Sequence, residues 1–220
     1  MVSTSSSLLL ILCLSSVACG DDAAPGADVS FDSDFVDPGL SEIMTTTGSG
    51  EPAAGFDACE ITTAQHVTGR ASHTPNCSAL PYAEATPASG DHYGTWADFR
   101  RYEAPVPQGF VVHALEHGAI AIQYDCEDCT ELLAAIDTLI EEHGVDPACE
   151  PRGVDSRFLV APNPDIDDAL VVLTAWEHVY KATCIDVESM RAFIDAHYGQ
   201  GPEDLCARGL DGESRGGWCG

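Results

Sequence analysis

Residues 111–124, which read VVHALEHGAIAIQY, most constrain what this chain can fold into. Two histidines and a glutamate, His113, Glu116 and His117, lie inside this otherwise apolar run. Such side chains are costly to bury unless they are hydrogen-bonded, paired or bound to a metal. We therefore expect the segment to lie in the core and its polar residues to form a structured site.

The N-terminus has the layout of a secretory signal. A short apolar core at residues 8–14, too short to span a membrane, is followed by small residues. Val17-Ala18-Cys19 resembles the lipobox of bacterial lipoproteins, although Ser16 stands where leucine is usual and no Lys or Arg precedes the core. We expect residues 1–18 to be a signal peptide and Cys19 to be acylated. The protein would then be anchored in the bacterial cell envelope, facing the periplasm or the exterior. An ordinary cleaved signal is the alternative.

Composition separates a tether from a domain. Residues 20–55 carry aspartates among Ala, Gly, Ser, Thr and Pro, which is typical of a disordered acidic tether. Residues 56–220 are enough for a single domain with a hydrophobic core. The formal net charge is -27, from Asp+Glu 36 and Lys+Arg 9. Such a field repels nucleic acid, so we exclude nucleic-acid binding and expect a solvated acidic surface. No feature identifies a protein or small-molecule partner.

The chain has 10 cysteines. Setting aside Cys13 in the signal and Cys19 leaves an even number, which favours disulfides in an exported chain. These remaining cysteines are Cys59, Cys77, Cys126, Cys129, Cys149, Cys184, Cys206 and Cys219. Proximity along the chain suggests the pairs Cys59–Cys77 and Cys206–Cys219, which would close terminal segments that lack periodicity.

Apolar periodicity predicts an α+β domain. We expect strands at residues 119–124, 157–161 and 169–176, with a continuation of the last at 178–180 left open. Helices are expected at residues 130–143, ending before Gly144, and from the N-cap Asp186 to about Tyr198. This order implies a mostly antiparallel sheet with two main helices packed on it. Disulfides would staple the termini.

Three ordered blocks within residues 89–203 resemble the bacterial domain-of-unknown-function family 3105. They comprise residues 89–93 with Trp96, Tyr102 and 105–107; residues 112–118 with Tyr124; and residues 161–162, 174–176, 193–197 and 201–203. Asp91 stands where the family usually has proline and Ala114 where asparagine is common, and neither change removes a histidine. Members are often exported or membrane-tethered, but their activity is unassigned. The resemblance therefore implies that these residues form one domain and gives a shortlist of candidate site residues. It does not name a reaction.

Our first hypothesis is a site for copper or zinc. The candidate ligands are His92, His113, His117 and, as the weakest candidate, His197. Glu116 would serve as a ligand, as a carboxylate that orients an imidazole, or as a catalytic base. In a strand, the Cα atoms of His113 and His117 would lie about 13 Å apart, whereas a helix places both side chains on one face. Their co-ligation therefore requires a helical or tightly turned segment before Gly118.

Other interpretations stay open, including whether the protein is an enzyme. The spelling H-x-x-E-H also occurs in inverted zinc peptidases, but no partner helix with a further acidic ligand is evident. Cys126 and Cys129 follow a strand and open a helix, as in thiol-disulfide oxidoreductases. Glu127 and Asp128 between them would raise the pKa of the thiols, which favours a structural bridge.

A non-catalytic envelope lipoprotein is the remaining alternative. In that protein the buried histidines would form a hydrogen-bonded structural network with Glu116, and the domain would act as a binding or scaffolding module. Three further histidines lie in polar surroundings and are expected to be exposed: His66, His73 and His143.

Overall fold

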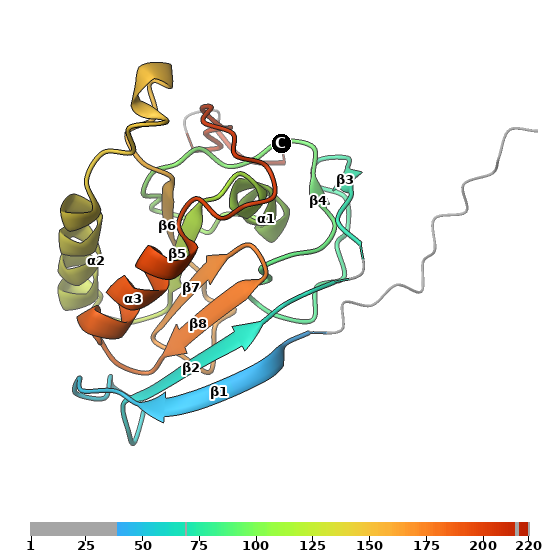
Figure 1. Cartoon of the computed structure of the whole chain (residues 1–220). Helices are drawn as coiled ribbons and strands as arrows, with labels where there is room; N and C mark the ends of the chain where they lie inside the picture. The colour runs from blue at the N-terminus through green and yellow to red at the C-terminus, as the bar shows by residue number, and fades with distance from the viewer. Residues whose placement is uncertain (1–38, 69, 214–215, 220) are drawn as a thin grey trace, which may run out of the picture. The chain divides into compact units, whose positions relative to one another are not determined.

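The computed structural model describes residues 39–68, 70–213 and 216–219 (Figure 1). The expected signal peptide, Cys19 and the first part of the expected tether lie outside the described residues. Among the helices that are described, none is both long and apolar enough to cross a bilayer.

Within these residues, a six-stranded sheet has the strand order β1-β2-β8-β7-β5-β6. The strands are β1 (Ser41–Thr47), β2 (Glu60–Gln65), β5 (Ile120–Tyr124), β6 (Phe158–Pro162), β7 (Val171–Ala175) and β8 (His178–Ala182). β5 and β6 pair in parallel, and the other neighbouring strands pair antiparallel. The predicted α+β class with a mostly antiparallel sheet is confirmed. The open continuation at residues 178–180 is a separate strand, β8.

Helices cover both faces of this sheet (Figure 1). Ile120 and Ile122 pack with α2 (Thr130–His143) and α3 (Val187–His197), the two helices predicted from the sequence. Ala121 points the other way and packs with α1 (Gln108–Glu116). The alternation follows from the two-residue period of a strand. It explains why β5 is buried along its whole length.

Helix α1 is one of the elements that apolar periodicity did not reveal. Residues 109–116 are all buried, so α1 has no polar face to produce an amphipathic pattern. Gly118 ends the helix with φ of +81°, in the left-handed region that glycine adopts readily. Its N–H donates to the carbonyl oxygen of Leu115 at 2.8 Å. The helical condition for a shared site at this motif is therefore met.

The expected tether does not extend to residue 55. β1 pairs with β2, with Thr46 opposite Ile61, and the Ala53 N–H donates to the carbonyl oxygen of Thr183 at 2.9 Å. Every side chain of β1 is exposed. The polar composition that indicated disorder therefore belongs to an edge strand, whose backbone hydrogen bonds hold it in place. The ordered domain begins before Phe56.

In the described part of the chain, four disulfides are formed: Cys59–Cys184, Cys77–Cys219, Cys126–Cys129 and Cys149–Cys206. The Cys77–Cys219 bridge confirms that disulfides staple the terminal regions. The expected pairs Cys59–Cys77 and Cys206–Cys219 are wrong, because spatial neighbours are set by strand pairing: β2 lies against β8 and brings Cys59 to Cys184. These bridges are consistent with an extracellular or periplasmic protein.

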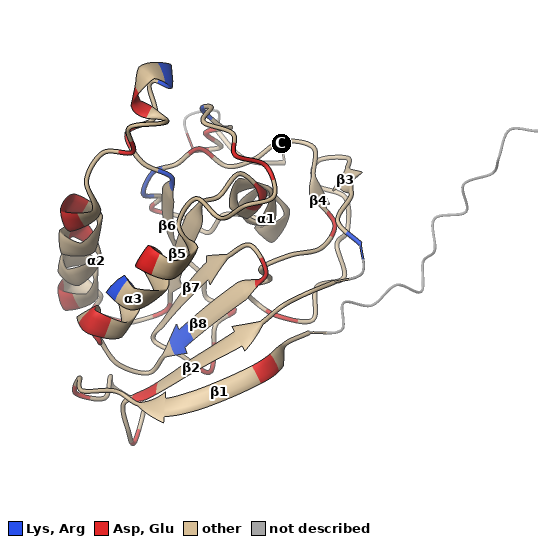
Figure 2. Ribbon diagram, viewed as in Figure 1, with Lys and Arg blue, Asp and Glu red and all other residues tan. Residues whose placement is uncertain are grey.

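Charge is distributed as the composition indicates. Acidic residues are spread over α2, α3 and the surrounding loops, whereas basic residues are few and scattered (Figure 2). The domain therefore presents an acidic exterior, with the histidine motif inside it.

Candidate metal centre

Three short elements bring four donor side chains together. β3 (His73–Thr74) carries His73, β4 (His92–Tyr93) carries His92, and α1 carries His113 and Glu116. β3 and β4 pair in parallel with His73 opposite His92. The i, i+3 spacing places His113 and Glu116 on one face of α1. One donor atom from each side chain lies within 4.8 Å of the others.

The carboxylate of Glu116 is the common contact of the three imidazoles. Its Oε2 lies 3.1 Å from Nε2 of His92, 3.4 Å from Nε2 of His73 and 3.8 Å from Nε2 of His113. Two donors that bind zinc tetrahedrally, each about 2.1 Å from the ion, lie about 3.4 Å from one another. The spacing of this cluster therefore fits a single transition-metal ion.

Backbone carbonyls orient the two buried imidazoles. Nδ1 of His92 lies 2.8 Å from the carbonyl oxygen of Gly90, and Nδ1 of His113 lies 2.6 Å from that of Tyr93. A carbonyl oxygen only accepts, so each Nδ1 carries a proton, and in the neutral ring Nε2 has a free lone pair. Metal-binding histidines are held in this way, with the second nitrogen donating to a carbonyl or carboxylate.

Burial and hydrogen bonding set the charges of the cluster. Burial lowers the pKa of His113 to about 4, against the opposing effect of its hydrogen bond to Tyr93. Burial would raise the pKa of Glu116, but its hydrogen bonds to His92 and His73 and the nearby imidazole charges lower it to about 2. At neutral pH the carboxylate is ionised and His113 is neutral. The lone pairs of the Glu116 carboxylate and of His113 Nε2 point toward the same space. A bound proton or a metal ion is needed there to offset their repulsion.

His117, a predicted ligand, lies beside this cluster in a different environment. It caps α1, and its ring is edge-on to that of His113 with centroids 4.7 Å apart. Its Nε2 lies 3.4 Å from Oε2 of Glu203. Burial lowers the pKa of His117 to about 4, although the charge of Glu116 opposes this.

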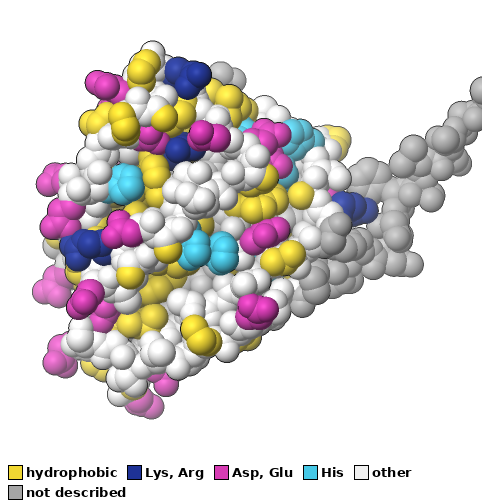
Figure 3. All heavy atoms as spheres, viewed as in Figure 1, with side chains coloured by type: hydrophobic (Ala, Val, Ile, Leu, Met, Phe, Trp, Pro, Cys, Tyr) yellow, Lys and Arg dark blue, Asp and Glu magenta, His cyan; other side chains and the backbone are white. Residues whose placement is uncertain are grey.

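His197, the weakest predicted ligand, is not brought to the cluster. Its ring stacks on that of His178 with centroids 4.0 Å apart, between α3 and β8. Burial lowers the pKa of His197 to about 4, and His178 acts in the same direction. Histidine side chains reach the visible surface at separate places (Figure 3). The histidines of this chain therefore do not form a single site.

His73 is the candidate ligand that sequence reasoning missed. Its side chain is 52% exposed, as expected, yet its ring stacks on that of His113 with centroids 4.6 Å apart. β3 and β4 have 2 residues each, too few for any periodic signal. His66, also expected to be exposed, is buried, and its Nδ1 accepts a hydrogen bond from the Ala88 N–H at 2.6 Å.

The predicted position of the two neighbouring cysteines is confirmed. Their disulfide follows β5, and Cys129 caps the N-terminus of α2. Cys126 lines a cavity of about 1200 Å³ whose walls are both apolar, as at Leu132 and Leu170, and acidic, as at Asp125.

The fold and the site define an α+β protein with a buried cluster of histidines around one glutamate. The chain belongs to the family described as Protein of unknown function (DUF3105), whose model matches residues 73–208. The match confirms the resemblance seen in the sequence, and it extends to include His73. No curated protein and no solved structure matches the chain significantly.

Proposed function

We propose that this protein binds a transition-metal ion, copper or zinc, at a site in an exported domain anchored to the bacterial envelope by a lipid. The ligands are His73, His92, His113 and Glu116. The observation that carries the proposal is the pair of carbonyl-anchored imidazoles whose Nε2 atoms converge on an ionised carboxylate. Neutral imidazoles suit zinc and copper, whereas calcium and magnesium take oxygen ligands.

One edge of the site is open to solvent. The side chain of His73 is 52% exposed, whereas those of His92 and His113 are 0% and 3% exposed. An ion held by the two buried histidines and Glu116 is therefore reached from the side of His73. The surface charge supports capture, because a field from a net charge of -27 attracts cations.

The envelope location is supported by two features. The four disulfides of the described residues are consistent with an oxidising compartment. The lipobox-like sequence ending at Cys19 would supply an acylated N-terminus, and acyl chains provide membrane affinity in proportion to the methylenes they bury.

Metal content tests the proposal directly. The full chain is produced in an oxidising compartment, reconstituted with zinc or copper, and measured by plasma mass spectrometry beside a His92→Ala/His113→Ala variant. His143→Gln is the control, since His143 lies in the last turn of α2. We expect at least one equivalent of metal in the parent and the control, and its loss in the double variant.

The same experiment decides a second candidate function, that of a non-catalytic binding or scaffolding lipoprotein. Nδ1 of His92 donates to a carbonyl while Nε2 lies 3.1 Å from Glu116, so a hydrogen bond between His92 and Glu116 could satisfy both side chains without a metal. A folded parent that takes up no metal after reconstitution would contradict the metal site and favour this structural network.

A further inference from the structure

We infer that the site takes a second divalent transition-metal ion, bound by Glu116, His117 and Glu203, so that Glu116 bridges two ions. The inference rests on the proposed function, because Glu116 is shared with the three-histidine site. It assigns a role to His117, which the first site does not use.

The spacing of the donors supports this second position. One donor atom each from Glu116, His117 and Glu203 lies within 4.8 Å of the others. The 3.4 Å between Nε2 of His117 and Oε2 of Glu203 equals the distance of about 3.4 Å expected between two ligands of one zinc ion. Oε2 of Glu116 faces the three imidazoles, which leaves its other oxygen for a second ion. Glutamates serve as shared ligands in dimetal proteins.

His117 is buried with incomplete hydrogen bonding. Its side chain is 1% exposed, and its ring lies edge-on to Trp96 with centroids 4.3 Å apart. In the described part of the chain, its Nδ1 is buried and has no hydrogen-bond partner. The corresponding atoms of His92 and His113 both reach carbonyl oxygens. Among the residues described, Nε2 has only the 3.4 Å contact with Glu203, and a cation bound between these two atoms would replace that contact with two direct bonds.

The backbone of residues 199–203 lies directly on the end of α1. The N–H of Glu203 donates to the carbonyl oxygen of Glu116 at 3.0 Å, and that of Gly199 donates to the carbonyl oxygen of Gly118 at 2.9 Å. A Cβ on Gly201 would meet the carbonyl oxygen of Glu116 and the nitrogen of Gly118. Only glycine permits this approach, which brings Glu203 to His117.

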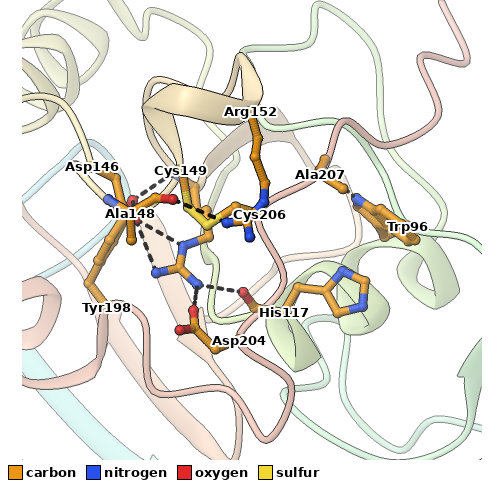
Figure 4. Close-up of a disulfide and its surroundings, with 11 residues drawn as sticks. Trp96, His117, Asp146, Ala148, Cys149, Arg152, Tyr198, Asp204, Cys206 and Ala207 are labelled. Atoms are coloured by element: carbon orange, nitrogen blue, oxygen red, sulfur yellow. Dashed lines mark hydrogen bonds and ion pairs between the residues drawn. A yellow bond between two sulfur atoms is a disulfide. The ribbon is translucent and has the colours of Figure 1, made fainter.

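The segment after Glu203 is held as well. Nη1 of Arg157 donates to the carbonyl oxygen of His117 at 2.9 Å and to Oδ1 of Asp204 at 2.7 Å. Cys206 is bonded to Cys149, and Figure 4 shows this bridge in the same region as Asp204 and His117. The Glu203 side chain is 54% exposed. Its backbone is nevertheless secured on both sides, so its carboxylate stays within reach of His117.

Counting bound zinc tests the inference. The metal-free full chain is dialysed against Zn²⁺ at about 0.5 M NaCl, which screens weak binding to the acidic surface, and is analysed by plasma mass spectrometry. Glu203→Gln removes the carboxylate charge at an exposed position without threatening the fold. Glu188→Gln, an exposed glutamate in the first turn of α3, is the matched control. We expect two equivalents in the parent and the control, and one in Glu203→Gln.

Copper supplies an independent readout. Two Cu²⁺ ions bridged by Glu116 couple magnetically, so the parent is expected to show a weakened or broadened paramagnetic resonance signal, and Glu203→Gln the signal of an isolated ion. The inference of a second ion would be overturned if the parent bound only one equivalent of zinc, or if Glu203→Gln retained two with equal affinity. Either result would leave the proposal of the first site intact. A parent that binds none would overturn the proposed function together with this inference.

Discussion

Nε2 of His92 lies 3.1 Å from Oε2 of Glu116 in the core, while Nδ1 of the same ring lies 2.8 Å from the carbonyl oxygen of Gly90. Both ring nitrogens therefore face acceptors. The metal-free pair needs a proton between His92 and Glu116 in addition to the one on Nδ1. A metal ion bound at Nε2 has to displace that proton.

Zinc binding is therefore expected to release the proton that is shared between His92 and Glu116. Titration calorimetry in two buffers of different ionisation enthalpy counts the protons released. His92→Gln, which lacks the ionisable ring, should release fewer protons and bind zinc more weakly. Binding by the parent with no proton release would contradict the shared proton.

Acid should destabilise the metal-free protein well above the pH at which its carboxylates titrate. The pKa values of His113 and His117 are lowered to about 4 by burial, whereas an unfolded histidine titrates near 6.5. Between these values the unfolded chain binds protons that the folded chain does not, so stability falls as the pH falls from about 6.5 to about 4.

The expected loss between about pH 7.5 and 5 is about 2 kcal/mol for each of these two histidines. Denaturant unfolding with a chelator present measures this loss. His143→Gln, outside the cluster, should leave the pH dependence unchanged. Equal free energies of unfolding at the two pH values would show that the buried imidazoles are not neutral.

Alanine substitutions at two helix-terminal glycines distinguish the cost of backbone strain from the cost of a steric clash. Gly118 and Gly144 have φ of +81° and +79°, but a Cβ at Gly118 would lie 2.9 Å from Arg157 Nη1 and 2.9 Å from Gly199 Cα, whereas Gly144 has open space. Gly144→Ala is expected to lower the free energy of unfolding by about 2 kcal/mol, because φ of 79° with ψ of -163° is a backbone conformation that essentially only glycine adopts. Gly118→Ala should cost about 3 kcal/mol or more, because backbone has to move as well.

Denaturant unfolding of both variants gives the comparison. Gly118→Ala should also reduce metal binding, since it displaces the segment that rests on α1. Equal effects of the two substitutions on stability would contradict the close packing of Gly199 and Arg157 against Gly118.

The loss of stability on removing a disulfide should depend on the length of chain that the bridge closes. Cys77–Cys219 spans a sequence separation of 142 and Cys126–Cys129 a separation of 3. Loop-closure entropy predicts that replacing both cysteines by serine costs roughly 5 kcal/mol at the long bridge and roughly 2 kcal/mol at the short one. Thermal or denaturant unfolding of the two double variants measures the difference. A larger loss at the short bridge would contradict the dependence of stability on the length of the closed loop.

The sequence by itself determined the local elements and the burial of the histidine motif. Helices α2 and α3 and strands β5, β6 and β7 were predicted because apolar spacing, the glycine after His143 and the N-cap Asp186 are signals carried by neighbouring residues. The burial of the motif at residues 113–117 followed from its apolar flanks. These properties depend on contacts over a few residues, which a linear pattern records.

The tertiary structure decided which side chains meet. His73 reaches the cluster through the pairing of β3 with β4, and Cys59 meets Cys184 through the pairing of β2 with β8. His117 faces Glu203 because the chain turns back onto the end of α1 at residues 199–203. Each contact joins segments that are distant along the chain. Such contacts are set by the sum of packing and backbone hydrogen bonding over the whole domain, for which no local pattern is a signal.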